Sequence, residues 1–266
     1  MTVKVQVGPP QIAIHQGQTV LISEEDGQIN WPSEKGLYFL DTRLISSWAI
    51  YANGEAWELL NGGAISYYAS RIFLTNRSLL TEDGTIPPRM LGLTVSRSIR
   101  GGVHEDIDVT NNGMIPVRFQ LEIALRCDFA DVFEVKSGRI VRRGRITTQW
   151  SEPHQRLRTT YRNGDFSRAV TIRPAVSSAR ALYANGRLSF EVALEPGEPW
   201  HCCLHYTPRA SAAVKHRAAY PQKERNQSDH RSPAAYSGRQ RAGGFGWPQV
   251  ILMVSRLVRL SSLWRR

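Results

Sequence analysis

The feature that most constrains the fold of this chain is its repeated use of dipeptides that favour tight turns between β-strands. Asn-Gly and Asp-Gly both tolerate the positive φ angles that two-residue hairpin loops require. Seven such dipeptides occur in the first 207 of the 266 residues, and they begin at Asp26, Asn53, Asn61, Asp83, Asn112, Asn163 and Asn185. So many turn signals predict antiparallel sheet.

The segments between the turn signals alternate apolar and polar residues, as strands with one buried face do. The run 117–125 places an apolar side chain at every second position, from Val117 to Leu125. The run 188–194 repeats this pattern, and Val103, Ile107 and Val109 follow the same spacing. Each run therefore predicts a half-buried strand.

Together these patterns predict an all-β fold, a large antiparallel β-sandwich (super-sandwich) of about 200 residues. Little helix is expected, because no window of a dozen residues carries an apolar stripe of helical spacing without a Gly, a Pro or a clear alternation. The irregular spacing of the strands fits one large sandwich better than a repeat array.

Charge divides the chain into two parts. The formal net charge is +11, yet residues 1–207 hold 22 Lys and Arg against 21 Asp and Glu, whereas residues 208–266 hold 12 against 2. The second part is rich in Ala, Arg, Ser and Pro and shows neither a strand nor a helix period before Val250. We therefore predict a β-sandwich domain over 1–207 and a poorly ordered basic tail over 208–266.

Apolar runs and cysteines bear on where the protein resides. No stretch approaches the roughly 18 uninterrupted apolar residues of a membrane helix, and residues 1–8 lack the apolar run of a secretion signal. The three cysteines, Cys127, Cys202 and Cys203, cannot all pair, which argues against a disulfide-stapled secreted domain. These features predict a cytoplasmic protein with reduced thiols and no membrane partner.

A first candidate site lies in the segment GLYFLDTRLISSW, residues 36–48. Asp41 and Arg43 are two positions apart on a predicted extended stretch, so their side chains share one face. They could form an ion pair that closes a loop, or they could hold the hydroxyl groups of a sugar. Spacing alone favours the structural bridge.

A second candidate site lies in CDFADVFEV, residues 127–135, where Asp128, Asp131 and Glu134 bring three carboxylates into seven positions. Glycoside hydrolysis needs two carboxylates on either side of a scissile bond, which a single segment seldom provides. The segment also lacks the Gly-containing loop of a Ca²⁺ site and any Gly-rich phosphate cradle. No catalytic residue and no cofactor are assigned from it.

Metal-ligating residues gather at WHCCLHYT, residues 200–207. His201, Cys203 and His205 fall on one face of a predicted strand and could converge on Zn²⁺. No fourth ligand is evident in the sequence, and histidines on a solvent-facing strand are more often simple polar residues. We therefore predict no metal site, and the absence of a Gly-x-Ser-x-Gly elbow leaves no nucleophile motif either.

Taken in order, the segments 36–48, GVHEDIDVTNNG (102–113) and 127–135 resemble the N-terminal domain of bacterial and archaeal glycogen debranching enzymes of the amylo-α-1,6-glucosidase type. The similarity runs from about Gln11 to Thr207, and DFADVFE is its most specific part. The chain departs from the family's motif at Leu40 and Ile45, where the family commonly carries a basic residue and a leucine.

The resemblance implies a β-sandwich that precedes an (α/α)6 toroid, with the acid and base carboxylates for α-1,6-glucosidic hydrolysis on the toroid. It implies that the sandwich is non-catalytic and meets an α-glucan through the full-length enzyme. Asp41, Arg43, Asp128, Asp131 and Glu134 then become candidates for a glucan-facing or inter-domain surface.

The segment after Thr207 does not continue the family's pattern, because a basic tail of 59 residues stands where several hundred residues of helical domain are expected. Arg outnumbers Lys by 29 to 5, as in a GC-rich gene, and an out-of-frame reading of such a gene would yield a similar Ala, Arg, Ser and Pro mixture. We therefore expect a truncated or frame-shifted fragment that is inactive alone and self-associates through an uncovered apolar patch.

Three other functions remain open. A free-standing carbohydrate-binding module would present an exposed aromatic platform, drawn from Trp31, Tyr38, Trp48 or Trp57. A nucleic-acid binder would use tail residues such as Arg239 and Arg241, but the tail lacks regularly interleaved aromatics. An intact glycosidase would need both carboxylates on the sandwich itself. We expect neither of the last two.

Overall fold

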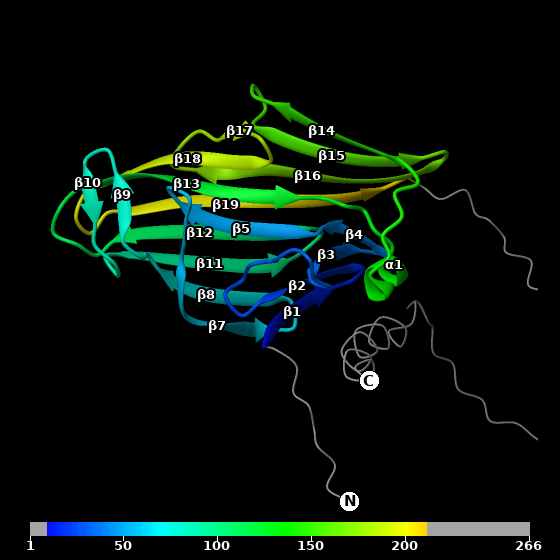
Figure 1. The fold of residues 1–266 in the computed structure, drawn as a ribbon, viewed down its shortest axis with the longest axis horizontal. Helices are drawn as coiled ribbons and strands as arrows, with labels where there is room; N and C mark the ends of the chain where they lie inside the picture. The colour runs from blue at the N-terminus through cyan, green and yellow to red at the C-terminus, as the bar shows by residue number, and fades with distance from the viewer. Residues whose placement is uncertain (1–9, 212–266) are drawn as a thin grey trace, which may run out of the picture. The chain divides into compact units, whose positions relative to one another are not determined.

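The computed structural model describes residues 10–211, and the structural statements that follow concern these residues. They form an all-β sandwich of stacked antiparallel sheets (Figure 1). The fold class predicted from the sequence is therefore confirmed. The predicted basic tail lies outside the described residues except for its first four positions, so its boundary stays a prediction.

The larger sheet has eight strands in the order β14-β15-β16-β19-β12-β11-β8-β7. Their bounds are β7 Glu58–Ser66, β8 Ala69–Thr75, β11 Leu91–Ile99, β12 Val103–Asn111, β14 Arg145–Ser151, β15 Arg156–Asn163, β16 Phe166–Ser177 and β19 Pro199–Ala210. All neighbouring strands are antiparallel.

The opposing sheet has five strands in the order β17-β18-β13-β5-β6. Their bounds are β5 Ser47–Ala52, β6 Glu55–Ala56, β13 Val117–Arg126, β17 Leu182–Ala184 and β18 Arg187–Leu194. The predicted runs 117–125 and 188–194 are β13 and β18. Buried side chains alternate along β18 as expected, and along β13 as far as Leu121. Beyond it Glu122, on the predicted polar face, is buried as well, and Leu125 is only half-buried.

Smaller elements lie at the two ends of the sandwich (Figure 1). A four-stranded sheet comprises β1 Gln11–Gln16, β2 Thr19–Glu24, β3 Gly36–Phe39 and β4 Thr42–Ile45, and the helix α1 spans Val132–Ser137. At the other end, β9 Leu79–Thr81 and β10 Gly84–Ile86 form a hairpin. The six-residue α1 is the only helix in the described part of the chain, so little helix is what the structure contains.

One hydrophobic core fills the space between the large sheets and takes side chains from both. Phe190 of β18 meets Trp200 of β19 edge to face, with ring centroids 5.5 Å apart. Trp48 of β5 donates its indole N–H to the hydroxyl of Tyr206 on β19 at 3.0 Å. These contacts link the two sheets across the core.

The predicted turn signals are partly confirmed. Asn53-Gly54 and Asn185-Gly186 are the two-residue loops of β5–β6 and β17–β18. Two others are wrong: Asn61-Gly62 lies inside β7 beside a register shift, and Asn112-Gly113 follows β12 where the chain leaves one sheet for the other. The dipeptides permit a turn, but strand pairing decides whether one forms.

The described cysteines, Cys127, Cys202 and Cys203, are all unpaired thiols. Within residues 10–211 no helix has the length and apolarity to span a bilayer.

Candidate functional site

The two segments that the sequence singled out meet at the α1 end of the sandwich. The amide of Arg43 donates to the carbonyl of Ala130 at 2.9 Å, and the amide of Val132 donates to the carbonyl of Asp41 at 2.9 Å. Thr42 and Asp131 form an isolated β-bridge between these bonds. The hairpin β3–β4 and the start of α1 are therefore joined through the backbone.

Arg43 lies at the centre of this junction, and its side chain is buried. Its Nε and Nη2 contact the two carboxylate oxygens of Asp128 at 3.3 and 2.5 Å. Its Nη1 donates to the carbonyl of Ser33 at 2.5 Å. A planar guanidinium suits this forked arrangement, which fixes the loop before β3 to the end of β13.

The predicted ion pair between Asp41 and Arg43 is wrong. Asp41 occupies the two-residue loop between β3 and β4, next to Leu40 with its φ of 58°, so the alternation of an extended strand does not apply there. The Asp41 carboxylate instead lies 3.4 Å from the guanidinium of Arg168 on β16. Arg43 does form a structural bridge, but with a residue 85 positions away.

Asp131 and Glu134 cap α1. A side-chain oxygen of Asp131 accepts the amide of Phe133 at 2.8 Å, and Glu134 accepts the amide of Asp131 at 3.3 Å. Glu134 also contacts Arg143 at 2.6 Å. The helix was not predicted, although Asp131 and Glu134 have the spacing of a capping box, which could have revealed it.

A pocket of about 220 Å³ opens over this junction. Four of the five candidate residues, Asp41, Asp128, Asp131 and Glu134, line it, whereas the buried Arg43 lies outside the lining. Arg142 and Arg143 contribute positive charge, and Tyr161 and Phe166 contribute rings. The pocket can therefore offer acceptors and donors to hydroxyl groups, or receive a protruding side chain.

Exposed apolar residues lie in and beside the pocket. Phe133 on α1 is 75% exposed and Val141 is 54% exposed, and Ile140 and Phe166 are partly exposed as well. Val141, Ile140 and Phe166 line the pocket, and Phe133 lies between two capping residues that do so. We call these four residues the apolar rim.

The aromatic platform considered for a carbohydrate-binding module does not form. Tyr38, Trp48 and Trp57 are buried in the core, and only Trp31 of the four is exposed. The Trp31 ring lies 5.6 Å from the guanidinium carbons of both Arg43 and Arg126. The pKa of Tyr38 is raised to about 12, because the effect of burial exceeds the opposing effect of the neighbouring Arg43 charge.

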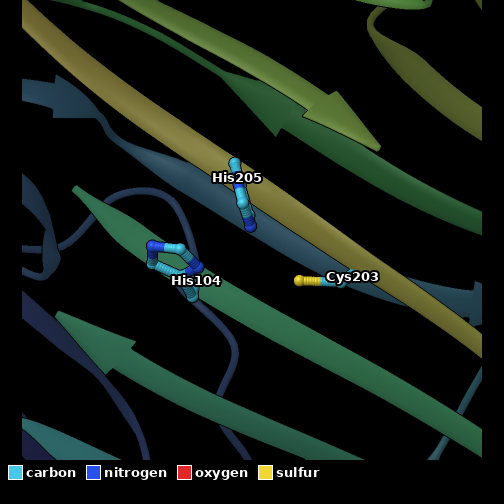
Figure 2. Close-up of side chains that lie close together, drawn as sticks. All are labelled: His104, Cys203 and His205. Carbon is cyan, nitrogen blue, oxygen red and sulfur yellow. The ribbon is translucent and has the colours of Figure 1, made fainter. Parts of the chain in front are cut away.

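The residues that could hold a metal ion form a different trio from the one considered in the sequence. Ligand atoms of His104, Cys203 and His205 all lie within 4.8 Å of one another (Figure 2). His201 instead contacts Asp108, with Nδ1 and Oδ1 2.7 Å apart. His104 was missed because it lies on β12, whose pairing with β19 cannot be seen in the local spacing of residues 200–207.

Burial and neighbouring charges together lower the pKa of one member of this trio and raise the pKa of another. Burial, neighbouring His104 and Arg173 lower the pKa of His205, so its ring is held neutral more strongly than a free histidine. Burial, together with Asp106, raises the pKa of the Cys203 thiol to about 12. The histidine is therefore ready to coordinate, whereas the thiol gives up its proton only to a strong competitor.

Solved structures show a likeness in fold at low sequence identity. A protein described as a candidate kojibiose phosphorylase from human microbiome matches with a TM-score of 0.53 and 10% identity, over 75% of this chain and 30% of that chain. A candidate aldose 1-epimerase from Escherichia coli K12 matches with a TM-score of 0.46 and 12% identity, over 77% of this chain and all of that one. This chain thus spans less than a third of the phosphorylase.

Curated proteins gave no match. A family model described as the N-terminal domain of (some) glycogen debranching enzymes matches residues 14–205. That match covers the strands from β1 into β19, including both segments that build the pocket. The chain therefore belongs to the family of N-terminal domains of glycogen debranching enzymes.

Proposed function

We propose that this sandwich is a non-catalytic domain that packs against a helical (α/α)6 catalytic domain and helps to shape a groove for α-glucans. In that assembly the helical domain supplies the carboxylates that hydrolyse α-1,6 branch points. The sandwich supplies a rigid surface beside them. Membership of the debranching family supports the partner and substrate class, and the α1 end supports the location of the contact.

The observation that carries the proposal is the combination of the apolar rim with the charged pocket. Interfaces between domains combine an apolar centre with polar groups around it, and monomers seldom leave such a patch open. Phe133 projects from a helix that is capped and anchored to β4, so this member of the apolar rim is held in place before a partner arrives. A fixed surface loses little conformational entropy on docking.

The roles of the candidate residues differ within this proposal. Arg43 and Asp128 hold the junction together, and Asp131 and Glu134 hold α1. Asp41 has a side chain that is half exposed and lines the pocket, so among the five it is the one freest to meet a glucan hydroxyl or the partner domain. None of the five is proposed as a catalytic acid or base.

The test mixes the full chain with the helical catalytic domain of a bacterial debranching enzyme of this family and measures association by sedimentation. We expect a complex that Phe133→Asp weakens by about tenfold or more, since a charge would enter an apolar contact. Leu80→Asp is the matched control. Leu80 is 78% exposed, but it lies on the β9–β10 hairpin at the far end (Figure 1).

Two results would overturn the proposal. One is the absence of a complex, or a complex that tolerates Phe133→Asp as well as Leu80→Asp. The other is release of glucose from a branched dextrin by the purified chain alone, because the sandwich would then carry its own catalytic carboxylates.

A carbohydrate-binding module is the second candidate, and the exposed Trp31 is the observation in its favour. An aromatic face can stack on a sugar ring, and the neighbouring arginines can donate to hydroxyl groups. Calorimetric titration of the chain with maltooligosaccharides separates the two candidates. Heat that disappears in Trp31→Ala supports the module, and no heat favours a purely structural domain.

A further inference from the structure

The trio His104, Cys203 and His205 lies on the outer face of the eight-stranded sheet, away from the core. β12 and β19 are adjacent and antiparallel, with His104 directly opposite His205 and Asp106 directly opposite Cys203. Their sequence neighbours Val103 and Leu204 are buried in the core, so alternation places the trio on the opposite face. All three members are half-buried, which leaves them reachable from solvent.

The side chains already converge. The rings of His104 and His205 have centroids 4.0 Å apart, and the Cys203 sulfur points toward the space beside them (Figure 2). A tetrahedral Zn²⁺ site with bonds of about 2.0–2.3 Å needs ligand atoms roughly 3.3–3.8 Å apart. The ligand atoms here lie within 4.8 Å of one another, so small side-chain rotations on fixed strands would close the site.

The charges around the trio suit a cation. Asp106 is directly opposite Cys203 in the pairing of β12 with β19 and lies 3.9 Å from His201, and Asp108 contacts His201 from the next outward position of β12. Arg173 on β16 carries an opposing positive charge. It is directly opposite His205 in the pairing of β16 with β19 and is exposed to water. Two carboxylates therefore offset one solvated guanidinium.

We propose that His104, Cys203 and His205 bind a divalent transition metal of the Zn²⁺ class. Two imidazole nitrogens and one thiolate select such a metal over Mg²⁺ or Ca²⁺, which prefer oxygen ligands. On binding, the metal–sulfur bond replaces the sulfur–hydrogen bond, and the thiol proton passes to solvent. The fourth position stays open to water or to the Asp106 carboxylate.

Cobalt is the probe for this site, because a thiolate bound to Co²⁺ gives a charge-transfer band in the near ultraviolet. The full chain, reduced and freed of metal, is titrated with CoCl₂, and Zn²⁺ is then added in competition. We expect a band that saturates at one metal per chain and is abolished by Zn²⁺. Its thiolate must be one of three, since the chain contains only Cys127, Cys202 and Cys203.

Matched variants assign the ligands. Cys203→Ser should abolish the band, and His104→Gln should weaken Zn²⁺ affinity by about tenfold or more. Cys127→Ser and His201→Gln are the controls. Cys127 lies at the end of β13, and His201 occupies the same face of β19 without belonging to the trio. Both controls should leave affinity and band unchanged, and far-ultraviolet circular dichroism should report the same sheet in all four variants.

The proposal fails if the unmodified chain gives no thiolate band, or if the band survives Cys203→Ser. It also fails if His201→Gln weakens the metal as much as His104→Gln does. Histidines elsewhere in the chain cannot mimic a positive result, because the band requires a sulfur ligand.

Discussion

Arg43 and Asp41 stand two positions apart in one motif, yet they do different work. The Arg43 side chain is 1% exposed and bonds to Asp128 and the Ser33 carbonyl, so it links three separate segments. The Asp41 side chain is 52% exposed, and its contact with Arg168 is 3.4 Å long. Solvent screens the second contact far more than the first.

Substitution separates the two roles. Arg43→Lys should lower the free energy of unfolding by about 2 kcal/mol or more, because an ammonium cannot replace the forked contact and leaves Asp128, whose side chain is only 12% exposed, underpaired. Asp41→Asn should cost less than about 1 kcal/mol, because the Asp41 carboxylate is half exposed and its contact with the buried Arg168 is long. Urea denaturation of the full chain measures both. Equal losses would contradict the assignment of Arg43 as the structural member.

At the scale of elements, alternation predicted β12, β13 and β18 because it reports a local property, the side of the strand that faces the core. The sequence also marked both segments that meet at the pocket. It could not predict the Arg43–Asp128 bond or the approach of His104 to Cys203 and His205. Those contacts depend on which strands become neighbours, and such pairing is set by the packing of the whole sandwich.

Asn61-Gly62 shows the same limit within a single strand. The dipeptide predicts a turn, but here it continues β7, and the glycine serves a close approach of two backbones. A Cβ on Gly62 would lie 2.6 Å from the carbonyl oxygen of Glu25, whereas a Cβ on Gly63 would have no atom within 4 Å. A contact with a distant segment therefore requires glycine at position 62, whereas no contact requires it at position 63.

Gly62→Ala should therefore lower the free energy of unfolding by about 1–3 kcal/mol, since the Glu25 segment or β7 must shift to admit the methyl group. Gly63→Ala is the matched control and should be neutral or slightly stabilising. Thermal or urea denaturation distinguishes them. If both variants were equally stable, the contact with Glu25 would not constrain this edge of the sheet.

At the scale of the whole molecule, the two large sheets share a buried polar chain as well as an apolar core. Trp48 donates to Tyr206, Tyr206 donates to Glu105 at 2.5 Å, and Arg97 contacts the other oxygen of Glu105 at 2.6 Å. The guanidinium carbon of Arg97 also lies 4.2 Å from the centroid of the Trp48 ring, so Arg97 contacts the five-stranded sheet directly as well. Loss of the Tyr206 proton would place a second negative charge beside Glu105, where both side chains are buried from water.

This burial makes the stability of the fold sensitive to alkaline pH. Burial raises the pKa of Cys202 from its ordinary 9.0 to about 12, and burial with Glu105 raises the pKa of Tyr206 well above 10.0. Above pH 9 the unfolded chain therefore loses the Cys202 proton while the folded chain keeps it, so the folded state binds more protons. Stability must then fall as pH rises.

We expect the free energy of unfolding to decrease from about pH 9 upward, and more steeply once the pH passes the ordinary pKa of tyrosine, near 10. Urea denaturation under reducing conditions at successive pH values measures the slope. Cys202→Ala should flatten the first part of the decrease and Tyr206→Phe the second, even though each variant is less stable at neutral pH. A slope that neither substitution changes would mean that these groups ionise as readily in the folded sandwich as in the unfolded chain, and that water reaches the space between the sheets.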